Sequence, residues 1–291
     1  MNFLFWSGAG VLLLLGGTVW FSHAFARRAL QAPRAARDPQ PQTALPLEPI
    51  EVIGEAGTLR GWFVSQPSGE QRPTILLTHG WGRSAAQMLP FAEFLFREGY
   101  HLCLYDVRGH GNSDQDRDGL VSMQRFGRDI MTMANYCCSR PDVEVSRLGH
   151  LGHSMGAAAS FYAAHEGRRF RCMVASSGFA DLRDLVGWML RATHLPPVPL
   201  QPLILYFWRR RLHVSLAQVN PIDLLPLLEL PVLIAHGDED AIVPHHQLRK
   251  LQAHGRNGNV QALLLPGRRH SDLHADPAYV RTVKEFFAKH L

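Results

Sequence analysis

The sequence predicts an α/β fold, in which a mostly parallel central sheet is covered by helices on both faces. From residue 50 onward, short apolar runs alternate with longer stretches whose apolar residues recur at helical spacing. Several runs are almost continuously hydrophobic, which is typical of strands buried on both faces of a parallel sheet. Residues 181–219, rich in Leu, Trp and Pro, break this alternation. They predict an insertion above the sheet, which we call the cap.

Residues 1–26 are predicted to form a transmembrane anchor. Residues 3–26 contain no Asp, Glu, Lys or Arg, and as a helix they are long enough to span roughly 30 Å of hydrocarbon. A cleaved signal peptide is the alternative, because residues 24–26 form the A-x-A pattern of a cleavage site. All nearby arginines follow the apolar run, which favours a membrane-anchored protein with its catalytic domain in the cytoplasm over an exported one.

The basic residues of the chain indicate membrane topology rather than a nucleic-acid partner. The formal net charge is +5, and residues 1–47 hold +3 of it next to the apolar segment. We therefore expect no nucleic-acid partner. Residues 27–49 carry five prolines and are predicted to be an extended linker, and residues 50–291 are predicted to be one domain that includes the cap.

Apolar runs and helical periodicity predict the elements of this domain in order. The predicted strands are residues 50–53, 59–64, 74–78, 101–105, 148–151, 172–175, 232–235 and 260–265. The predicted helices are residues 87–97, 122–138, 157–164, 245–254 and 277–290.

No metal, disulfide or nucleotide cofactor is predicted. The four cysteines show neither a CxxC pair nor zinc spacing, so we interpret them as small buried residues. The string Gly109-His110-Gly111 lacks the spacing of a dinucleotide fingerprint, and no phosphate loop is present in the sequence. The chemistry must then come from side chains alone.

The string GHSMG, residues 152–156, predicts a nucleophilic serine at Ser154. A strand precedes it and a helix of small residues follows, which is the context of a nucleophile elbow. Glycines on both sides of the serine allow the sharp turn, because larger side chains would clash with the neighbouring strand and helix. An ordinary Gly-rich turn is the alternative, and it does not require this context.

His270 is the predicted general base that activates the serine hydroxyl. It follows the last predicted strand and a Pro-Gly turn, at the carboxyl end of the sheet where α/β folds bind ligands. His274 is the alternative base. The acid that orients the base is expected in HGDEDAIVP, which offers Asp238, Glu239 and Asp240. Asp238 is the alternative acid, although its position suits it better to fix the turn.

Two backbone N–H groups are predicted to bind the oxyanion of a tetrahedral intermediate. One belongs to Met155, directly after the nucleophile. The other is expected from Trp81, in the HGWG string of residues 79–82, where glycines allow a close approach of the backbone to the substrate. His79 and His153 are predicted to have structural roles.

These motifs together resemble the α/β-hydrolase superfamily over about residues 50–291. The strings LLTHGWGRS, YDVRGHGNSD, LGHSMG, VLIAHGDEDAIVP and LLLPGRRH occur in the order of that family. The chain is most similar to bacterial membrane-anchored hydrolases of the esterase, lysophospholipase and serine-aminopeptidase-like branch. The resemblance implies an α/β-hydrolase fold without a cofactor, and it assigns Asp240 as the acid. It does not identify the substrate, because this fold hosts many hydrolases.

The predicted function is hydrolysis of carboxylic esters through an acyl-enzyme. An aminopeptidase, amidase or thioesterase with the same triad is the alternative, and a non-catalytic binding protein is less consistent with a complete triad. In the cap, arginines outnumber Asp181 and Asp184, which argues against a pocket for a substrate's amino group. The apolar residues between 185 and 208 predict a small-molecule ester substrate with an apolar acyl group.

Overall fold

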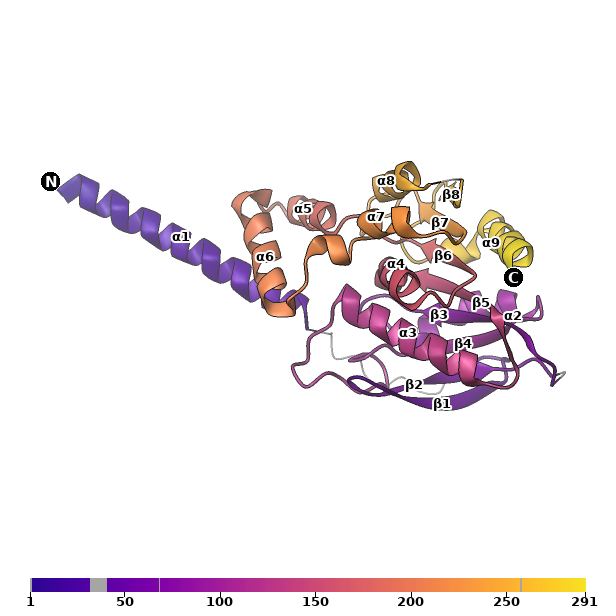
Figure 1. Ribbon diagram of the computed structural model, residues 1–291. Coiled ribbons are helices and arrows are strands. Elements are labelled where there is room, and N and C mark those ends of the chain that lie inside the picture. Colours follow the sequence, from indigo (N-terminus) through magenta and orange to yellow (C-terminus); the bar gives the residue numbers. More distant parts are fainter. Residues whose placement is uncertain (1, 32–40, 68, 257) are drawn as a thin grey trace. The chain divides into compact units, whose positions relative to one another are not determined.

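The computed structural model describes residues 2–31, 41–67, 69–256 and 258–291, with side chains from residue 13 onward. The chain divides into two compact units. One contains α1 (Asn2–Ala29), α5 (Leu182–Ala192) and α6 (Pro197–Leu212). The other contains the sheet and the remaining helices (Figure 1).

Within the described residues, the larger unit is built on an eight-stranded sheet with the order β1-β2-β4-β3-β5-β6-β7-β8. β2 pairs antiparallel with both β1 and β4, and every other neighbouring pair is parallel. The strands are β1 (Leu47–Gly54), β2 (Gly57–Val64), β3 (Arg72–Thr78), β4 (His101–Tyr105), β5 (Val143–His153), β6 (Cys172–Ser176), β7 (Val232–Gly237) and β8 (Val260–Leu265). The predicted mostly parallel α/β sheet is therefore confirmed.

The central parallel strands β4, β6 and β7 are buried because helices cover both of their faces. All residues of β4, β6 and β7 are buried, as their continuous apolar runs predict. β5 shows the two faces most clearly. A Cβ on Gly149 would lie 2.9 Å from Phe287 of α9, whereas a Cβ on Gly152 would lie 2.6 Å from the Gly156 oxygen of α4.

Two groups of helices cover this sheet. α2 (Leu89–Phe96) and α9 (Pro277–His290) contribute to one apolar core cluster with the strands. α3 (Met123–Ser139) packs on α4 (Met155–Gly167), and Figure 1 shows these two helices side by side. The shorter helices α7 (Pro221–Leu224) and α8 (His246–His254) contact each other near β7.

Side-chain caps mark the starts of α3 and α9. Ser122 precedes α3, and its hydroxyl oxygen accepts the backbone N–H of Arg125 at 3.3 Å. Asp276 precedes α9 and accepts the N–H of Ala278 at 2.8 Å, with proline at the first helical position.

β5 begins five residues before the predicted strand. Its first half is largely exposed and polar, so no apolar run marks it in the sequence.

In the smaller unit, the end of α1 packs against the helices of the cap. Ala26 is 2% exposed and shares an apolar cluster with Val186, Leu190 and Ile204. The indole Nε1–H of Trp208 donates to the Ala26 carbonyl oxygen at 2.9 Å. The end of α1 is therefore a packing partner of α6 within this unit.

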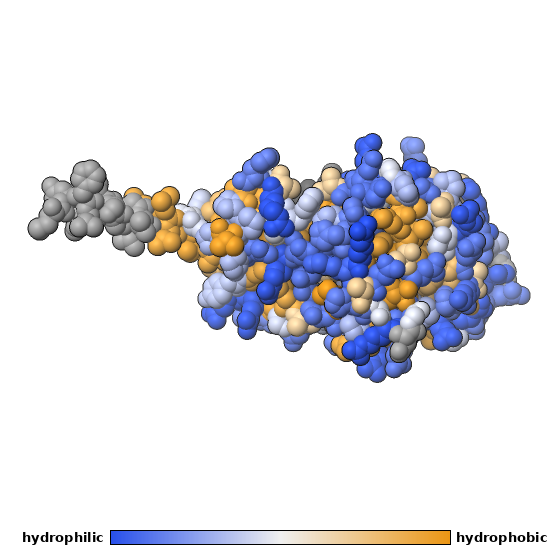
Figure 2. Space-filling view, turned by 90° about the horizontal axis from the view of Figure 1, so that it is seen from above, coloured by the Kyte–Doolittle hydropathy of each residue, from blue (hydrophilic) through white to orange (hydrophobic). Residues whose placement is uncertain are grey.

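The earlier described part of α1 is apolar and exposed. Its exposed side chains include Leu13, Leu14, Leu15, Val19 and Trp20, and Figure 2 shows this part of α1 in orange.

The prediction of a transmembrane anchor is not supported. Among the residues that the structure describes, no helix combines the length and the apolar character needed to cross a membrane. Residues 32–40 of the predicted linker lie outside the described residues. α1 extends to Ala29 and β1 begins at Leu47, so regular structure takes up both ends of the range predicted as linker.

Candidate active site

Ser154 lies in a sharp turn between β5 and α4. Its backbone has φ 54° and ψ −116°, a strained conformation for a residue other than glycine. A Cβ on Gly152 would lie 2.6 Å from the Gly156 oxygen, and one on Gly156 would lie 2.5 Å from the Thr78 oxygen. Both positions therefore require glycine, and the turn presents the serine at the carboxyl end of β5.

His270 links Ser154 to Asp240. Its Nδ1 lies 2.7 Å from Asp240 Oδ2, and its Nε2 lies 2.9 Å from Ser154 Oγ. Because the ionised carboxylate can only accept, the Nδ1–H donates to it, which leaves the Nε2 lone pair free to accept the serine proton. The structure thus brings together three side chains whose hydrogen bonds run in the direction that activates a serine.

Asp240 is buried but ionised. Burial raises the pKa of this carboxyl, yet hydrogen bonds from His236 and His270, the charge of His270 and the Val243 N–H outweigh burial, so the pKa of Asp240 lies well below its usual range. Oδ1 accepts the N–H groups of Ile242 and Val243 at 2.9 and 2.8 Å. Asp240 can therefore orient His270 and would stabilise a positive charge on its ring.

The HGWG loop, residues 79–82, follows β3 and lies beside Ser154. A Cβ on Gly80 would lie 3.1 Å from Ser154 Cβ, so only glycine allows this approach without displacement. The Gly80 N–H donates to Gln87 Oε1 at 3.0 Å, and this bond holds the loop in place. The Trp81 N–H belongs to this loop, and the Met155 N–H is at the first position of α4, where an N–H has no acceptor within its own helix.

A second loop, after β4, supports the HGWG loop. The Asp106 carboxylate accepts the N–H of Ala85 at 2.7 Å and that of Asn112 at 2.8 Å. The His110 ring packs edge-on against Trp81, with 5.7 Å between ring centroids. His79 Nε2 accepts the N–H of Val107 at 3.1 Å.

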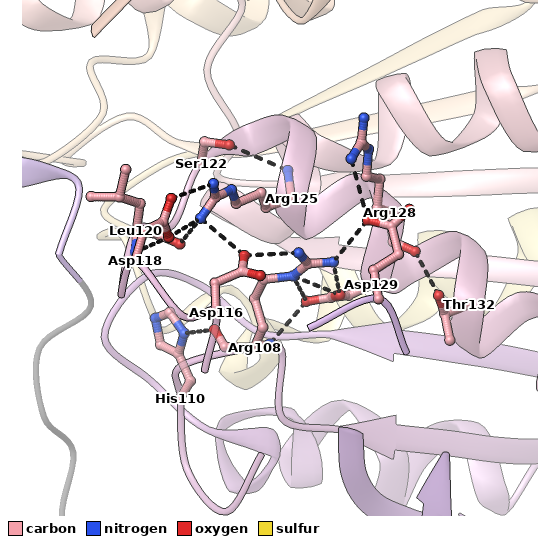
Figure 3. A network of polar contacts seen from close by, with 11 residues as sticks. Arg108, His110, Asp116, Asp118, Leu120, Ser122, Arg125, Arg128, Asp129 and Thr132 are labelled. Carbon is pink, nitrogen blue, oxygen red and sulfur yellow. Dashed lines mark hydrogen bonds and ion pairs between the residues drawn. The ribbon is translucent and has the colours of Figure 1, made fainter. Parts of the chain in front are cut away.

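A buried ion pair attaches this second loop to α3. Arg108 is 3% exposed and Asp129 is 1% exposed, and the two are joined by bonds of 2.6 to 3.1 Å (Figure 3). Asp116 adds a second carboxylate at 2.9 Å. Burial lowers the pKa of Arg108, but hydrogen bonds and charges of these two carboxylates outweigh it and raise the pKa above its usual value.

The alternative base and acid have other partners. His274 packs edge-on against Phe91 at 5.3 Å between ring centroids, and its Nδ1 is buried without a hydrogen-bond partner among the described residues. Asp238 Oδ1 accepts the N–H of Gly267 at 2.7 Å, which fixes the turn before His270. Glu239 is exposed.

No motif in the sequence assigns a functional role to His236. Its Nε2 lies 3.1 Å from Asp240 Oδ2, and its side chain is fully buried. The only signal for it in the sequence is its place at the start of the same HGDED string that holds the acid.

Within the residues that the structure describes, no group of three or more His, Cys, Asp or Glu could hold a metal ion. The four cysteines are free. Cys103, Cys137 and Cys172 are buried, as predicted, whereas Cys138 is only half-buried. The arrangement of Ser154, His270 and Asp240 is suited to acyl transfer through a covalent serine intermediate.

The family described as Hydrolase_4: Serine aminopeptidase, S33 matches residues 69–224 of the chain. This segment includes the HGWG loop and Ser154, and it ends before Asp240 and His270. The chain is similar to the uncharacterized protein Rv2307c of Mycobacterium tuberculosis (strain ATCC 25618 / H37Rv), with 26% identity covering 90% of this chain and 86% of that protein. It is also similar to the uncharacterized protein YfhR of Escherichia coli (strain K12), with 25% identity covering 82% of this chain and 77% of that protein.

Solved structures with the same fold include two esterases. The Pyrococcus furiosus esterase Pf2001 has a TM-score of 0.70 and 20% identity, and the match covers 90% of this chain and 99% of that one. The acetyl xylan esterase from Paenibacillus sp. R4 has a TM-score of 0.66 and 17% identity, and the match covers 94% of this chain and 93% of that one. These similarities show that the fold is that of an α/β hydrolase.

Proposed function

Because the chain belongs to the serine aminopeptidase S33 family of α/β hydrolases, we propose that it is a serine hydrolase that cleaves carboxylic esters. One observation carries the proposal: hydrogen bonds run from Ser154 Oγ through His270 to Asp240, at 2.9 and 2.7 Å. The strained turn at Ser154 supports it, because such strain is typical of functional positions.

In the proposed reaction, Ser154 Oγ attacks the carbonyl carbon of the ester while His270 Nε2 takes the hydroxyl proton. The N–H groups of Trp81 and Met155 stabilise the oxyanion that forms. The C–O bond then breaks, and the alcohol leaves with the proton that His270 returns. A water molecule, deprotonated by His270, attacks the acyl-enzyme in turn, and the acid is released with Ser154 restored.

An amide or peptide substrate is the second candidate, because the family is described as serine aminopeptidases. An aminopeptidase also needs a group that binds the free amine of its substrate. Asp240 is not available for that role, because N–H groups already occupy both of its oxygens. The esterases among the structural neighbours support the choice of an ester.

Two measurements test the proposal. A fluorophosphonate probe should label the wild-type protein and fail to label Ser154→Ala, whereas Ser160→Ala, a buried serine on α4, should still be labelled. Rates on matched ester, thioester and anilide substrates then identify the leaving group, and we expect the ester to react fastest. Labelling of a folded Ser154→Ala variant would refute the nucleophile, and faster anilide turnover would identify an amidase or peptidase.

A further inference from the structure

The Asp240 carboxylate binds two histidines, and only one of them reaches Ser154. Oδ2 lies 2.7 Å from His270 Nδ1 and 3.1 Å from His236 Nε2. We propose that His236 is a positioning residue for the reaction, which holds the Asp240 carboxylate in the orientation that His270 requires. The inference rests on the proposed hydrolase function.

The hydrogen-bond partners of His236 locate its proton. Nε2 also lies 2.8 Å from the carbonyl oxygen of Val243, and both this oxygen and the Asp240 carboxylate can only accept. The hydrogen must therefore be on Nε2, which donates toward both oxygens. His236 Nδ1 is buried and has no hydrogen-bond partner among the described residues, so the ring reaches polar groups through Nε2 alone.

With His236 included, four N–H groups surround the two oxygens of Asp240. Oδ1 accepts from Ile242 and Val243, and Oδ2 accepts from His270 and lies 3.1 Å from His236 Nε2, whose N–H it shares with the Val243 oxygen. A carboxylate has about four lone-pair sites, so its acceptor capacity is filled. Any rotation of the carboxylate would break several of these bonds, which is why its orientation toward His270 is fixed.

His236 also closes the turn that carries the acid. It lies in β7, which ends at Gly237, and through the Val243 oxygen it binds the far end of the turn. Without the Nε2–H, Oδ2 would keep only His270, and the buried Val243 oxygen would lose this partner. The carboxylate could then turn away from His270, which would weaken the general base without affecting substrate binding.

Two substitutions of His236 distinguish the effect of its N–H donor from the effect of the volume of its ring. His236→Phe keeps a ring but has no N–H, whereas His236→Gln places an amide N–H at a similar reach. We expect His236→Phe to lower kcat on an ester about 10- to 100-fold, the effect of one lost hydrogen bond to a charged group, with KM changed less than about twofold. His236→Gln should recover most of the lost kcat. His245→Phe, at a half-buried residue that follows the same turn and does not contact Asp240, is the matched control and should leave kcat unchanged.

A spectroscopic readout distinguishes positioning from a general loss of structure. The proton between His270 Nδ1 and Asp240 should give a low-field proton NMR resonance in the wild type and in His236→Gln. It should shift or broaden in His236→Phe. If His236→Phe fails to fold, His236→Asn takes its place, because its amide is too short to reach Asp240.

The outcomes separate this inference from the proposed function. A wild-type kcat in a folded His236→Phe or His236→Asn variant would overturn the proposed role of His236. An equal loss of kcat in His236→Gln, with an unchanged resonance, would also overturn it. If Ser154→Ala is inactive and these variants are fully active, only the role of His236 is wrong. If a folded Ser154→Ala remains active, the proposed function itself is wrong.

Discussion

The Nδ1–H of His79 donates to the carbonyl oxygen of Gly80 at 2.7 Å. His79 Nε2 accepts the N–H of Val107, so the hydrogen is on Nδ1 and the ring is neutral. Burial, with the nearby His110, lowers the pKa of His79 to about 3, which keeps the ring neutral in the working range. A trans peptide directs its C=O and N–H in opposite directions, so the bond to the Gly80 oxygen also sets the direction of the Trp81 N–H.

The first prediction concerns this peptide. His79→Leu removes the donor, so the Trp81 N–H, which the proposed mechanism assigns to the oxyanion, should lose its fixed direction. We expect kcat to fall by up to about 100-fold, the lower end of the effect of losing one oxyanion donor, with a smaller change in KM. His79→Asn keeps an N–H near the Nδ1 position and should lose less. Equal losses of kcat in folded His79→Leu and His79→Asn would show that the N–H donor of His79 does not affect the reaction.

The second prediction distinguishes the two carboxylates of the turn. Asp240→Asn should lower kcat by about four orders of magnitude, because an amide cannot enforce the Nδ1–H tautomer of His270. Asp238→Asn is the control: an amide oxygen can still accept the Gly267 N–H, so activity should stay within a few-fold of wild type. Steady-state rates on one ester decide. A small loss of kcat in Asp240→Asn together with a large loss in Asp238→Asn would show that Asp238, and not Asp240, is the acid.

The third prediction concerns the ion pair beneath the second loop. Asp129→Ala leaves the buried Arg108 charge without its main partner and should lower the free energy of unfolding by about 3 to 5 kcal/mol. Asp118→Asn disrupts the more exposed pair with Arg125 and should cost less than about 1 kcal/mol. Urea unfolding of both variants measures the difference.

A double substitution checks the cause of this effect. Replacing Arg108 by Met and Asp129 by Leu together removes both charges, so the loss of stability should be smaller than in Asp129→Ala. A loss at least as large in the double variant would show that packing, not the unpaired charge, dominates.

The fourth prediction is a steep loss of stability in acid. Burial lowers the pKa of His79, His150 and His153 to about 3 each, whereas a histidine in the unfolded chain titrates near about 6.5. As the pH falls below about 6.5, these histidines bind protons in the unfolded chain but stay unprotonated in the folded protein. Their contribution to stability is therefore fully present above about pH 6.5 and decreases toward pH 3, by about 1.4 kcal/mol per pH unit for each histidine.

A single substitution tests this slope. His150→Leu should reduce the pH dependence of the unfolding free energy between pH 4 and 6 by about 1.4 kcal/mol per unit, whatever it does to stability at neutral pH. The exposed His254→Gln should leave the slope unchanged. Parallel slopes for His150→Leu and wild type would mean that His150 is not buried in its neutral form.

Local patterns predicted most of the fold. The strand at residues 101–105 and the helix at residues 277–290 have the predicted bounds, because a continuous apolar run and helical periodicity mark their buried faces. The strand at residues 260–265 also has its predicted bounds. The sequence does not mark the start of β5, because residues 143–147 mix valines with polar residues and most of their side chains are exposed or half-buried. The end of α1 was assigned to a membrane because an apolar helix face looks the same in sequence whether lipid or α6 covers it.

By itself, the sequence determined the α/β fold and the serine turn, because both depend on residues that are adjacent in the chain. The sequence favoured His270 over His274, and the family resemblance assigned Asp240 over Asp238. Only the tertiary structure gives the distances that join Asp240, His270 and Ser154, because these residues lie far apart in the chain. The strand order places the ends of β5, β7 and β8 at one edge of the sheet, and there the Asp240 carboxylate lies 2.7 Å from the His270 imidazole. The role proposed for His236 likewise depends on a turn that returns to Asp240, and such a contact exists only once the chain has folded.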